Sequence, residues 1–320
     1  MEYRLLGSSG LAVSALALGT LTFGQETDEE GSFAQLDRFT EAGGSLIDTA
    51  DVYVGGRSEE IIGRWLSTRP GVRDSVVIAT KGRFPAGPGP NGHGLSRQHL
   101  SRALDGSLRR LQVDTIDLYQ LHGWDPLTGV EETLRFLDDA VRAGKINYVG
   151  LSNFTAWQIQ KYVDLAEAGG LWSRPVAVQP QYNLLARAIE WEIVPACQAA
   201  GLSLLPWSPL ASGWLTGKYR RGETYPSGSR MTQRPEPYQD LVAGRTFDFL
   251  DRLAAIAARR GTSMAGLALA WLLADERVSQ IVIGPGRPEH LTPVGEALEH
   301  PLSGDERAEI DEAVTAREAP

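Results

Sequence analysis

The sequence of 320 residues contains a single cysteine, Cys197. One cysteine forms neither an internal disulfide nor a thiolate metal cluster, which excludes the disulfide scaffolds of small secreted proteins. We therefore expect a reducing, cytoplasmic location. The five histidines show no HExxH or Cys/His spacing, so no metal site is predicted.

The chain also lacks a hydrophobic run of the roughly 20 residues that a membrane span needs. The apolar segment 10–21 is short and follows both Glu2 and Arg4, which argues against a signal peptide. Positive charge is scarce too: 31 Lys and Arg face 40 Asp and Glu, a formal net charge of −9. This balance disfavours nucleic acid and anionic membranes as partners, so any anion site must be local.

What the chain does contain is an alternation of short β-rich runs with longer amphipathic segments, which is typical of βα units around a parallel sheet. With 42% hydrophobic and 22% charged residues, it has ample material for a large core. The predicted strands are residues 13–20, 45–50, 76–81, 116–122, 148–153, 176–182, 202–208 and 281–284. The predicted helices are residues 27–42, 58–67, 96–111, 129–143, 155–167, 190–200, 262–274 and 288–298.

Eight βα pairs in order predict one α/β domain over residues 1–320, a (β/α)₈ TIM barrel, in preference to a doubly wound sheet. Three pieces stand outside the repeat. Residues 4–14 contain a Gly-Ser-Ser-Gly turn and predict a β-hairpin that closes the amino-terminal end of the barrel. Residues 210–245 form a long connection after the seventh strand and predict a lid. Residues 247–260 and 304–317 predict extra helices.

Several predicted strands end in a reactive side chain. Asp48, with Tyr53 just beyond it, ends the second strand, Lys81 ends the third and His122 ends the fourth. The carboxyl ends of parallel strands meet at one face of a barrel, where such enzymes build their sites. We therefore expect these four side chains to converge.

Together the four groups suit the reduction of a carbonyl, because hydride addition leaves an alkoxide that must be protonated. An ammonium beside a tyrosine lowers the phenol pKa towards neutrality, and a carboxylate holds the lysine in place. Tyr53, Lys81 and Asp48 supply these parts, and His122 could orient the oxygen or relay the proton. Singly, each residue also has an ordinary structural explanation: a turn, a solvated strand end, a packed ring or a structural histidine.

A second set of residues suits a phosphate. Gly284-Pro285-Gly286-Arg287 follows the eighth predicted strand, and a helix is expected to open at Pro288. Free N–H groups at a helix start and an arginine fork both favour a phosphate dianion. Because a 2′-phosphate distinguishes NADP from NAD, this segment predicts NADP(H) as the cofactor.

Apolar residues, three of them aromatic, follow the first four strands and predict an apolar, aromatic substrate mouth. This arrangement favours a carbonyl compound with a hydrophobic or ring-shaped body, although aromatic rings also stack on sugars. The rim 84–94 is rich in Pro and Gly and is either a flexible edge or a plain connector. The mouth residues are Phe23, Val54, Phe84 and Trp124, with Tyr53 and His122 beneath them.

The chain resembles the aldo-keto reductase superfamily, most closely its microbial and potassium-channel β-subunit-like branch. The resemblance covers nearly the whole chain, and its motifs occur in the family's order. They include LGSSGLAVS at 6–14, IDTADVY at 47–53, ATK at 79–81, SLRRL at 107–111, DLYQLH at 117–122, GKI at 144–146, GLSNF at 150–154, QPQYNL at 179–184 and WSPL at 207–210.

The resemblance implies that Asp48, Tyr53, Lys81 and His122 are the catalytic tetrad, with Tyr53 as the acid. It further implies a nicotinamide site in which Ser152, Asn153 and Gln179 hold the carboxamide and Trp207 stacks on the ring, while Lys218 and Arg230 clamp phosphate groups from the long loop. The remaining cofactor contacts that it implies are Thr20, Asp48, Ser208, Pro209, Leu210, Ser212, Gly213, Gly284, Gly286, Arg287 and His290. The sequence departs from the family's adenine contacts at His290, Pro293 and Val294.

The sequence therefore predicts an NADP(H)-dependent oxidoreductase that reduces an aldehyde or ketone to an alcohol, reversibly, with a small carbonyl compound or alcohol as its partner. Two alternatives stay open: a cofactor-sensing regulatory subunit with little turnover, and a sugar or nucleotide-sugar reductase of secondary metabolism. The sequence leaves the oligomeric state open.

Overall fold

The computed structural model describes residues 1–85, 87, 89–241 and 244–318. The chain divides into two compact units. The first comprises Met1–Pro180, Ile189–Leu205 and Ser279–Pro288, and the second comprises Gln181–Ala188, Pro206–Val278 and Glu289–Pro320.

All the strands of the main sheet lie in the first unit. They are parallel and follow the order β10-β3-β4-β5-β6-β7-β8-β9. The backbone amides of Ser279 and Gln280, just before β10, donate to the Leu204 carbonyl of β9 and bring the two edges of the sheet together. The predicted (β/α)₈ barrel is confirmed. The strands are β3 (Leu16–Gly19), β4 (Leu46–Asp48), β5 (Val77–Gly82), β6 (Ile116–Leu121), β7 (Ile146–Ser152), β8 (Pro175–Gln179), β9 (Ser203–Leu204) and β10 (Ile281–Ile283).

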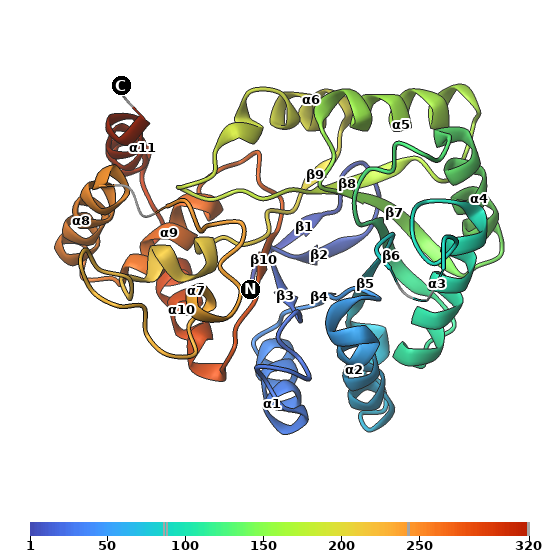
Figure 1. Cartoon of the computed structure of the whole chain (residues 1–320), viewed down its shortest axis with the longest axis horizontal. Helices are drawn as coiled ribbons and strands as arrows, with labels where there is room; N and C mark the ends of the chain where they lie inside the picture. Colours follow the sequence, from blue (N-terminus) through green and yellow to red (C-terminus); the bar gives the residue numbers. More distant parts are fainter. Residues whose placement is uncertain (86, 88, 242–243, 319–320) are drawn as a thin grey trace. The chain divides into compact units, whose positions relative to one another are not determined.

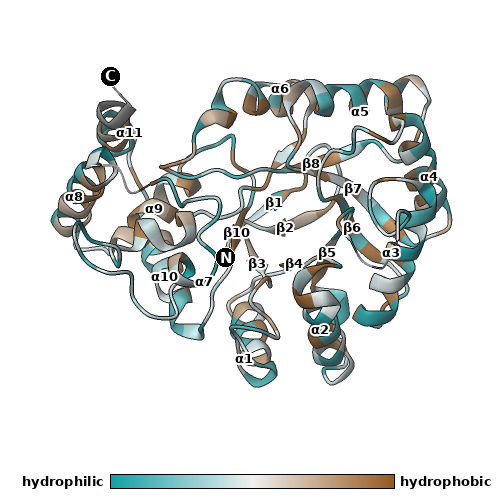
Figure 2. Cartoon of the chain, viewed as in Figure 1, coloured by the Kyte–Doolittle hydropathy of each residue, from teal (hydrophilic) through white to brown (hydrophobic). Residues whose placement is uncertain are grey.

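Six helices of the first unit follow these strands in the chain and surround them (Figure 1). Their starts carry the expected caps: Asp28 accepts from Gly31, Ser96 accepts from His99, and Thr155 forms a capping box with Gln158. Hydrophobic residues concentrate on the strands, while the helices show hydrophilic outer faces (Figure 2). The helices are α1 (Glu29–Glu41), α2 (Arg57–Ser67), α3 (Arg97–Leu111), α4 (Val130–Arg142), α5 (Ala156–Ala168) and α6 (Ile193–Ala200).

The amino-terminal segment forms the predicted hairpin from β1 (Tyr3–Leu5) and β2 (Ala12–Ser14). In its turn, the Gly7 amide donates to the Ser203 hydroxyl at 2.6 Å. A Cβ atom on Gly7 would lie 2.2 Å from the Val176 carbonyl oxygen, and the φ of Gly7 is +58°. Only glycine fits this close approach. The hairpin therefore packs against the starts of β8 and β9, at the end of the barrel opposite the strand carboxyl ends.

Every predicted strand differs from the observed one by at least one residue at an end, and three of the differences have a clear cause. The run 13–20 is two strands, because Ala15 donates to Glu2 of the hairpin side and accepts from Ile281 of the sheet, so the chain changes partner there. The runs 176–182 and 202–208 end early, at Gln179 and Leu204. Pro180 follows the first and Pro206 lies two residues beyond the second, and proline has no N–H to continue a ladder.

The second unit is helical. Tyr182 packs on Trp271, and Trp214 packs on Tyr219 and Phe247. The extra helices predicted at 247–260 and 304–317 are confirmed with slightly different ends, and the long connection 210–245 contains a 3-10 segment, Ala211–Thr216, and a short helix; its residues 242 and 243 lie outside the described residues. The helices are α7 (Arg230–Gln233), α8 (Gly244–Arg259), α9 (Met264–Leu273), α10 (Thr292–Glu299) and α11 (Gly304–Glu318).

Candidate active site

Strand register in the first unit brings the predicted catalytic residues together. Asp48 is the last residue of β4 and pairs with Ala79 of β5. Lys81 lies two residues further along β5 and therefore on the same face as Ala79. It pairs in turn with Gln120 of β6, and His122 follows directly after that strand. The site lies at the strand carboxyl ends, as expected.

Lys81 is completely buried. Its ammonium donates to Asp48 Oδ2 at 2.6 Å, to the Thr49 carbonyl at 2.8 Å and to the Tyr53 hydroxyl at 3.3 Å. These three acceptors match the three N–H donors of an ammonium, which allows a charge to exist in the core.

The second oxygen of Asp48 is held equally firmly. Asp48 Oδ1 accepts from Gln179 Nε2 at 2.8 Å and from Gln120 Nε2 at 3.0 Å. Gln120 is a member of the site that was not predicted. Its polarity within a mostly apolar run is visible in the sequence, but its place opposite Lys81 depends on the strand register.

A strained turn carries Tyr53. The Tyr53 amide donates to the Ala50 carbonyl, and the Asp51 amide donates to the Lys81 carbonyl. Beyond Tyr53, the φ of Val54 is +50°, a left-handed conformation that β-branched residues rarely adopt. Such strain concentrates at functional sites, where the surrounding structure enforces it.

The pKa of Tyr53 is raised, whereas the sequence analysis expected Lys81 to lower it. Burial raises the pKa of the Tyr53 hydroxyl above its usual 10, and the opposing effect of Lys81 does not reverse that direction. The physical reason is that Asp48 lies beside Lys81 and offsets its charge. For Lys81, burial lowers the pKa, but Asp48 and Tyr53 outweigh it and the net pKa is raised. Tyr53 is thus protonated and Lys81 charged at neutral pH.

His122 completes the cluster. Its ring contacts Tyr53 edge-on, with centroids 5.9 Å apart, and Phe84 at 4.8 Å. Burial, aided by the positive charges of Lys81 and Arg83, holds the pKa of His122 well below 6.5. Its Nδ1 is buried and has no hydrogen-bond partner among the described residues. His122 is therefore a neutral imidazole that can donate or accept a hydrogen bond.

The three residues predicted to hold a carboxamide converge beside Asp48. Ser152 ends β7 and its hydroxyl donates to the Gln179 carbonyl at 3.0 Å. Asn153 Nδ2 donates to the Ser152 hydroxyl at 3.1 Å and to the His122 carbonyl at 3.2 Å. Thr20 lies deeper, where its hydroxyl donates to the Asp48 carbonyl at 3.0 Å. Amide and hydroxyl groups thus gather on one side of the tetrad.

The loop Gly284 to Arg287 is tied to the chain after β3. Thr22 donates to the Pro285 carbonyl and Thr27 to the Gly286 carbonyl, at 3.0 and 3.1 Å. Arg287 is exposed. The helix predicted at 288–298 is divided into a 3-10 segment, Pro288–Leu291, followed by α10. Pro293 has no amide proton to continue an α-helix from Pro288. Arg287 therefore does not precede a continuous α-helix, and the helix dipole predicted there is not formed.

The other predicted cofactor residues lie in the second unit. Ser208, Ser212 and Gly213 all have positive φ, of 57°, 54° and 95°, and Trp207 pairs with Gln181. Lys218 folds back over Gly213, where a Cβ would lie 2.2 Å from Lys218 Cε. Of the remaining ones, Pro209 is buried, Leu210 half-buried and His290 exposed, and Arg230 begins α7.

The predicted mouth is only partly as expected. Phe23 is completely buried and belongs to the core. Trp124 is half-buried and packs against Phe154, Trp157 and Tyr162. Residues 86 and 88 of the predicted rim lie outside the described residues.

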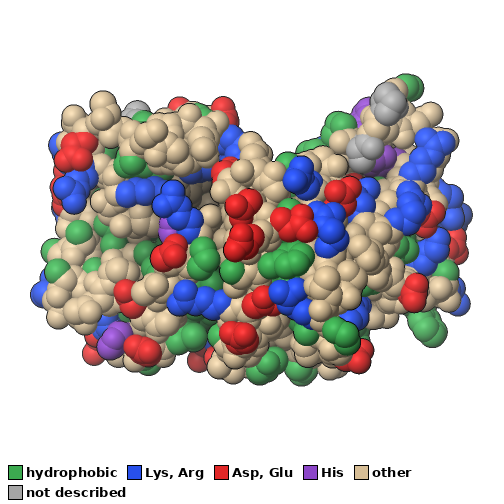
Figure 3. All heavy atoms as spheres, turned by 90° about the horizontal axis from the view of Figure 1, so that it is seen from below, with side chains coloured by type: hydrophobic (Ala, Val, Ile, Leu, Met, Phe, Trp, Pro, Cys, Tyr) green, Lys and Arg blue, Asp and Glu red, His purple; other side chains and the backbone are tan. Residues whose placement is uncertain are grey.

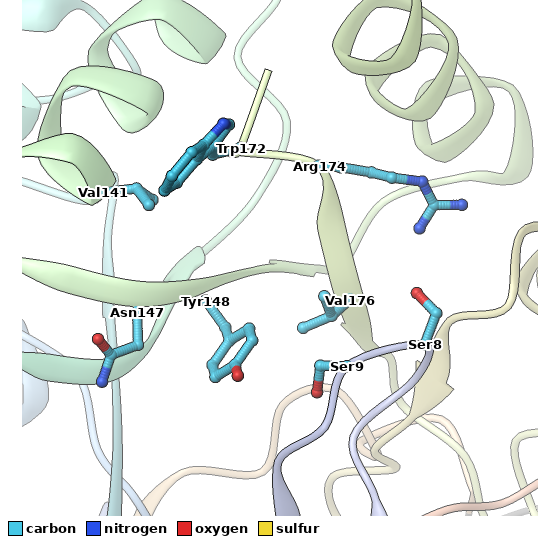
Figure 4. Close-up of a pocket in the computed structure, with 8 residues that line it drawn as sticks. All are labelled: Ser8, Ser9, Val141, Asn147, Tyr148, Trp172, Arg174 and Val176. Carbon is cyan, nitrogen blue, oxygen red and sulfur yellow. The ribbon is translucent and has the colours of Figure 1, made fainter. Parts of the chain in front are cut away.

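A cavity of about 360 Å³ lies in the first unit, at the amino ends of the strands. The hairpin turn, the starts of β7 and β8, and Trp172 and Arg174 surround it (Figure 4). Arg174 donates to Glu167 and to the carbonyls of Pro175 and Ala200. None of the predicted site residues lines it.

Acidic and basic side chains are interspersed over the face drawn in Figure 3. Within the described residues, no helix combines the length and the apolar character that crossing a membrane requires.

Cys197 is buried, and burial raises the pKa of its thiol to about 12.

Comparison with known proteins shows the family of the chain. Residues 15–315 match the Aldo/keto reductase family. The uncharacterized oxidoreductase YrpG of Bacillus subtilis is 38% identical over 307 residues, which cover 93% of this chain and 91% of that protein. A probable voltage-gated potassium channel subunit beta of Oryza sativa is 38% identical, with 93% and 92% covered. An L-glyceraldehyde 3-phosphate reductase of Escherichia coli O157:H7 is 36% identical, with 98% and 92% covered. The chain belongs to the aldo/keto reductase family of oxidoreductases.

Proposed function

We propose that the protein reduces an aldehyde or ketone to an alcohol, reversibly, with NADP(H) as cofactor and Tyr53 as the general acid. One observation carries the proposal: the buried Lys81 ammonium lies between the Tyr53 hydroxyl, at 3.3 Å, and the Asp48 carboxylate, at 2.6 Å. An ammonium in this position stabilises the phenolate that remains when the phenol gives up its proton.

The residues present suit a nicotinamide cofactor. Ser152, Asn153 and Gln179 offer amide and hydroxyl groups that match a carboxamide. The exposed Arg287 suits a 2′-phosphate, and a Cβ on Gly284 would meet only the Gly19 carbonyl oxygen, at 4.0 Å, so the backbone there is open to a ligand. When bound, the reduced nicotinamide supplies a hydride to the carbonyl carbon.

The chain's own residues orient and protonate the carbonyl oxygen of the substrate. The Tyr53 hydroxyl donates its proton to the carbonyl oxygen, so that the product is a neutral alcohol and the phenolate is left beside Lys81. Neutral His122 donates a hydrogen bond to the same oxygen and orients it. Gln120 and Gln179 hold Asp48, and Asp48 holds Lys81 in place. A proton from solvent restores the phenol.

The direct test is fluorescence titration of the apoprotein with NADPH and NADH, followed by turnover with a panel of aldehydes, ketones and sugars. We expect tighter binding of NADPH, an NADPH preference that Arg287→Gln reduces at least tenfold, and measurable carbonyl reduction. Equal affinity for the two cofactors would contradict the role of Arg287. Tight cofactor binding without turnover would favour a cofactor-sensing regulatory subunit with little turnover.

Three further predictions belong to this proposal. The 1–320 chain acts as one domain, the second-unit residues Trp207, Lys218 and Arg230 contact the cofactor, and the protein works in the cytoplasm. The consecutive left-handed residues around Ser212 support a ligand role for that loop, because backbone strain of this kind usually serves a site.

A further inference from the structure

Arg83 is a charged residue at the mouth of the site that the proposed chemistry does not use. It follows β5 directly, two residues after Lys81. Its Nη2 donates to the Trp124 carbonyl at 3.0 Å, and a Cβ on Gly123 would lie 3.5 Å from its Cδ. The side chain therefore crosses from the end of β5 to the residues that immediately follow His122.

The guanidinium is incompletely satisfied. Arg83 Nε is buried and has no hydrogen-bond partner, and the described residues give Arg83 no ion pair. Arg69, Arg110 and Arg174 of the same unit each pair with a carboxylate at 2.6 to 2.7 Å. Arg83 is half-buried. Because a charge that is partly removed from water is stabilised by an opposite charge, Arg83 is positioned to receive an anion.

The local electrostatics point the same way. Asp48 compensates the positive charge of Lys81, and His122 is neutral. The nearby Asp125 carboxylate already accepts from the Leu95 and Leu127 amides and the Thr128 hydroxyl, and it forms no ion pair with Arg83. Arg83 contributes to the lowered pKa of Asp125 without pairing with it, so the charge of Arg83 is only partly compensated beside His122.

The distance from Arg83 to the reacting position is short. Phe84 lies between them: its ring centroid is 4.7 Å from the Arg83 guanidinium carbon and 4.8 Å from the His122 ring centroid. The guanidinium and the imidazole are therefore no farther apart than the sum of these two distances. A molecule whose carbonyl contacts His122 and whose anion lies a few bonds away reaches both.

We propose that Arg83 binds an oxyanion of the substrate, and that the preferred substrates are short aldehydes or ketones carrying a carboxylate or a phosphate. The planar fork of arginine suits both groups, and Phe84 contributes an apolar wall along the connecting carbons. The inference rests on the proposed carbonyl reduction and narrows its substrate class. It also adds a cation to the apolar, aromatic mouth that the sequence predicts.

The test compares matched substrate pairs that differ in the anion. 4-Oxobutanoate against butanal probes a carboxylate, and glycolaldehyde phosphate against glycolaldehyde probes a phosphate. For the wild-type protein, we expect kcat/KM to favour the anionic member of at least one pair at least tenfold, and the pair that shows this identifies the anion. Raising the salt concentration should narrow the preference.

Substitution of Arg83 separates recognition from structure. Arg83→Gln should lower the anionic-to-neutral ratio of kcat/KM at least tenfold, mainly through the KM of the anionic member, and Arg83→Lys should retain part of the ratio. Arg97→Gln removes an exposed arginine of α3 that pairs with Asp139 and should leave the ratio unchanged. An unchanged ratio in Arg83→Gln, or a wild-type protein without anion preference, overturns the inference.

A binding measurement distinguishes this inference from the proposed function. Succinate and inorganic phosphate should raise the melting temperature of the wild-type protein more than that of Arg83→Gln, whether or not any carbonyl is turned over. Turnover without anion selectivity rejects the inference alone. Anion binding through Arg83 without turnover rejects the proposed reaction alone.

Discussion

The two ends of the barrel in the first unit differ in backbone strain and in the polar side chains that lie there. At the carboxyl ends of the strands, the buried Lys81, Asp48 and His122 lie beside a turn strained at Val54. At the amino ends, the hairpin turn at Gly7 packs closely on β8, and Arg174 has partners for its donors. The same scaffold therefore places a strained turn and the unpartnered Nδ1 of His122 at one end, and a closely packed glycine turn at the other.

The largest expected contrast is in activity. Lys81→Met removes the ammonium beside Tyr53 and should lower kcat about 10³-fold, within the range that general acid catalysis contributes. The matched change at the other end, Arg174→Met, should alter kcat less than threefold. Steady-state NADPH oxidation with one aldehyde measures both variants, and similar losses in the two would remove the distinction between the ends.

At the amino end of the barrel we expect a substitution to change the free energy of unfolding and not kcat. Gly7→Ala places a Cβ against the Val176 carbonyl and forces a left-handed alanine, which should cost about 2–4 kcal/mol of unfolding free energy. The kcat of the folded fraction should not change. Chemical denaturation and active-site titration measure the two quantities. A stable Gly7→Ala variant would mean that the hairpin can shift away from β8.

A buried carboxyl near the site gives a pH test of comparable size. Burial and the charge of Glu59 raise the pKa of Asp51 to about 7, against the opposing effects of Arg110, the Val52 amide and Lys81. Its bound proton therefore stabilises the fold fully below its ordinary pKa of 3.8, and this contribution is lost as the pH rises through about 7. Asp51→Asn should thus stabilise the protein at pH 8 by about 2–4 kcal/mol and have little effect at pH 4.

The control for that prediction is Asp37, whose pKa is lowered: burial opposes this, but hydrogen bonds from Arg69 and Trp65 outweigh it. Asp37→Asn should destabilise the protein at pH 8, with the opposite sign. Thermal unfolding of both variants across this pH range makes the comparison. If Asp51→Asn is also destabilising at pH 8, the buried Asp51 carboxylate has a partner that stabilises its charge.

The pH dependence of turnover is the smallest effect expected. Because the pKa of Tyr53 is raised, the phenol stays protonated through neutrality, and reduction should be nearly flat from pH 6 to 8. Alcohol oxidation needs the phenolate and should accelerate as the pH rises. Initial rates in both directions measure this. A reduction rate that falls tenfold between pH 6 and 8 would mean a Tyr53 pKa near neutrality.

Local patterns in the sequence predicted the barrel and the tetrad because both follow from them. The alternation of β-rich and amphipathic runs fixes the strand order, and Asp48, Lys81 and His122 end or follow buried strands. The partners of those residues depend on register and on side-chain paths between strands. Gln120 opposite Lys81, and Arg83 crossing to Trp124, are contacts of this kind. The direction of the Tyr53 pKa depends on burial, which no local pattern reports.

The central claim is that Tyr53, held beside Lys81, supplies the proton. Single-turnover reduction of an aldehyde by Tyr53→Phe with saturating NADPH tests it most directly, because the substitution removes only the hydroxyl. We expect the rate to fall about 10³-fold, with cofactor affinity retained. A rate within a few-fold of the wild type would contradict it.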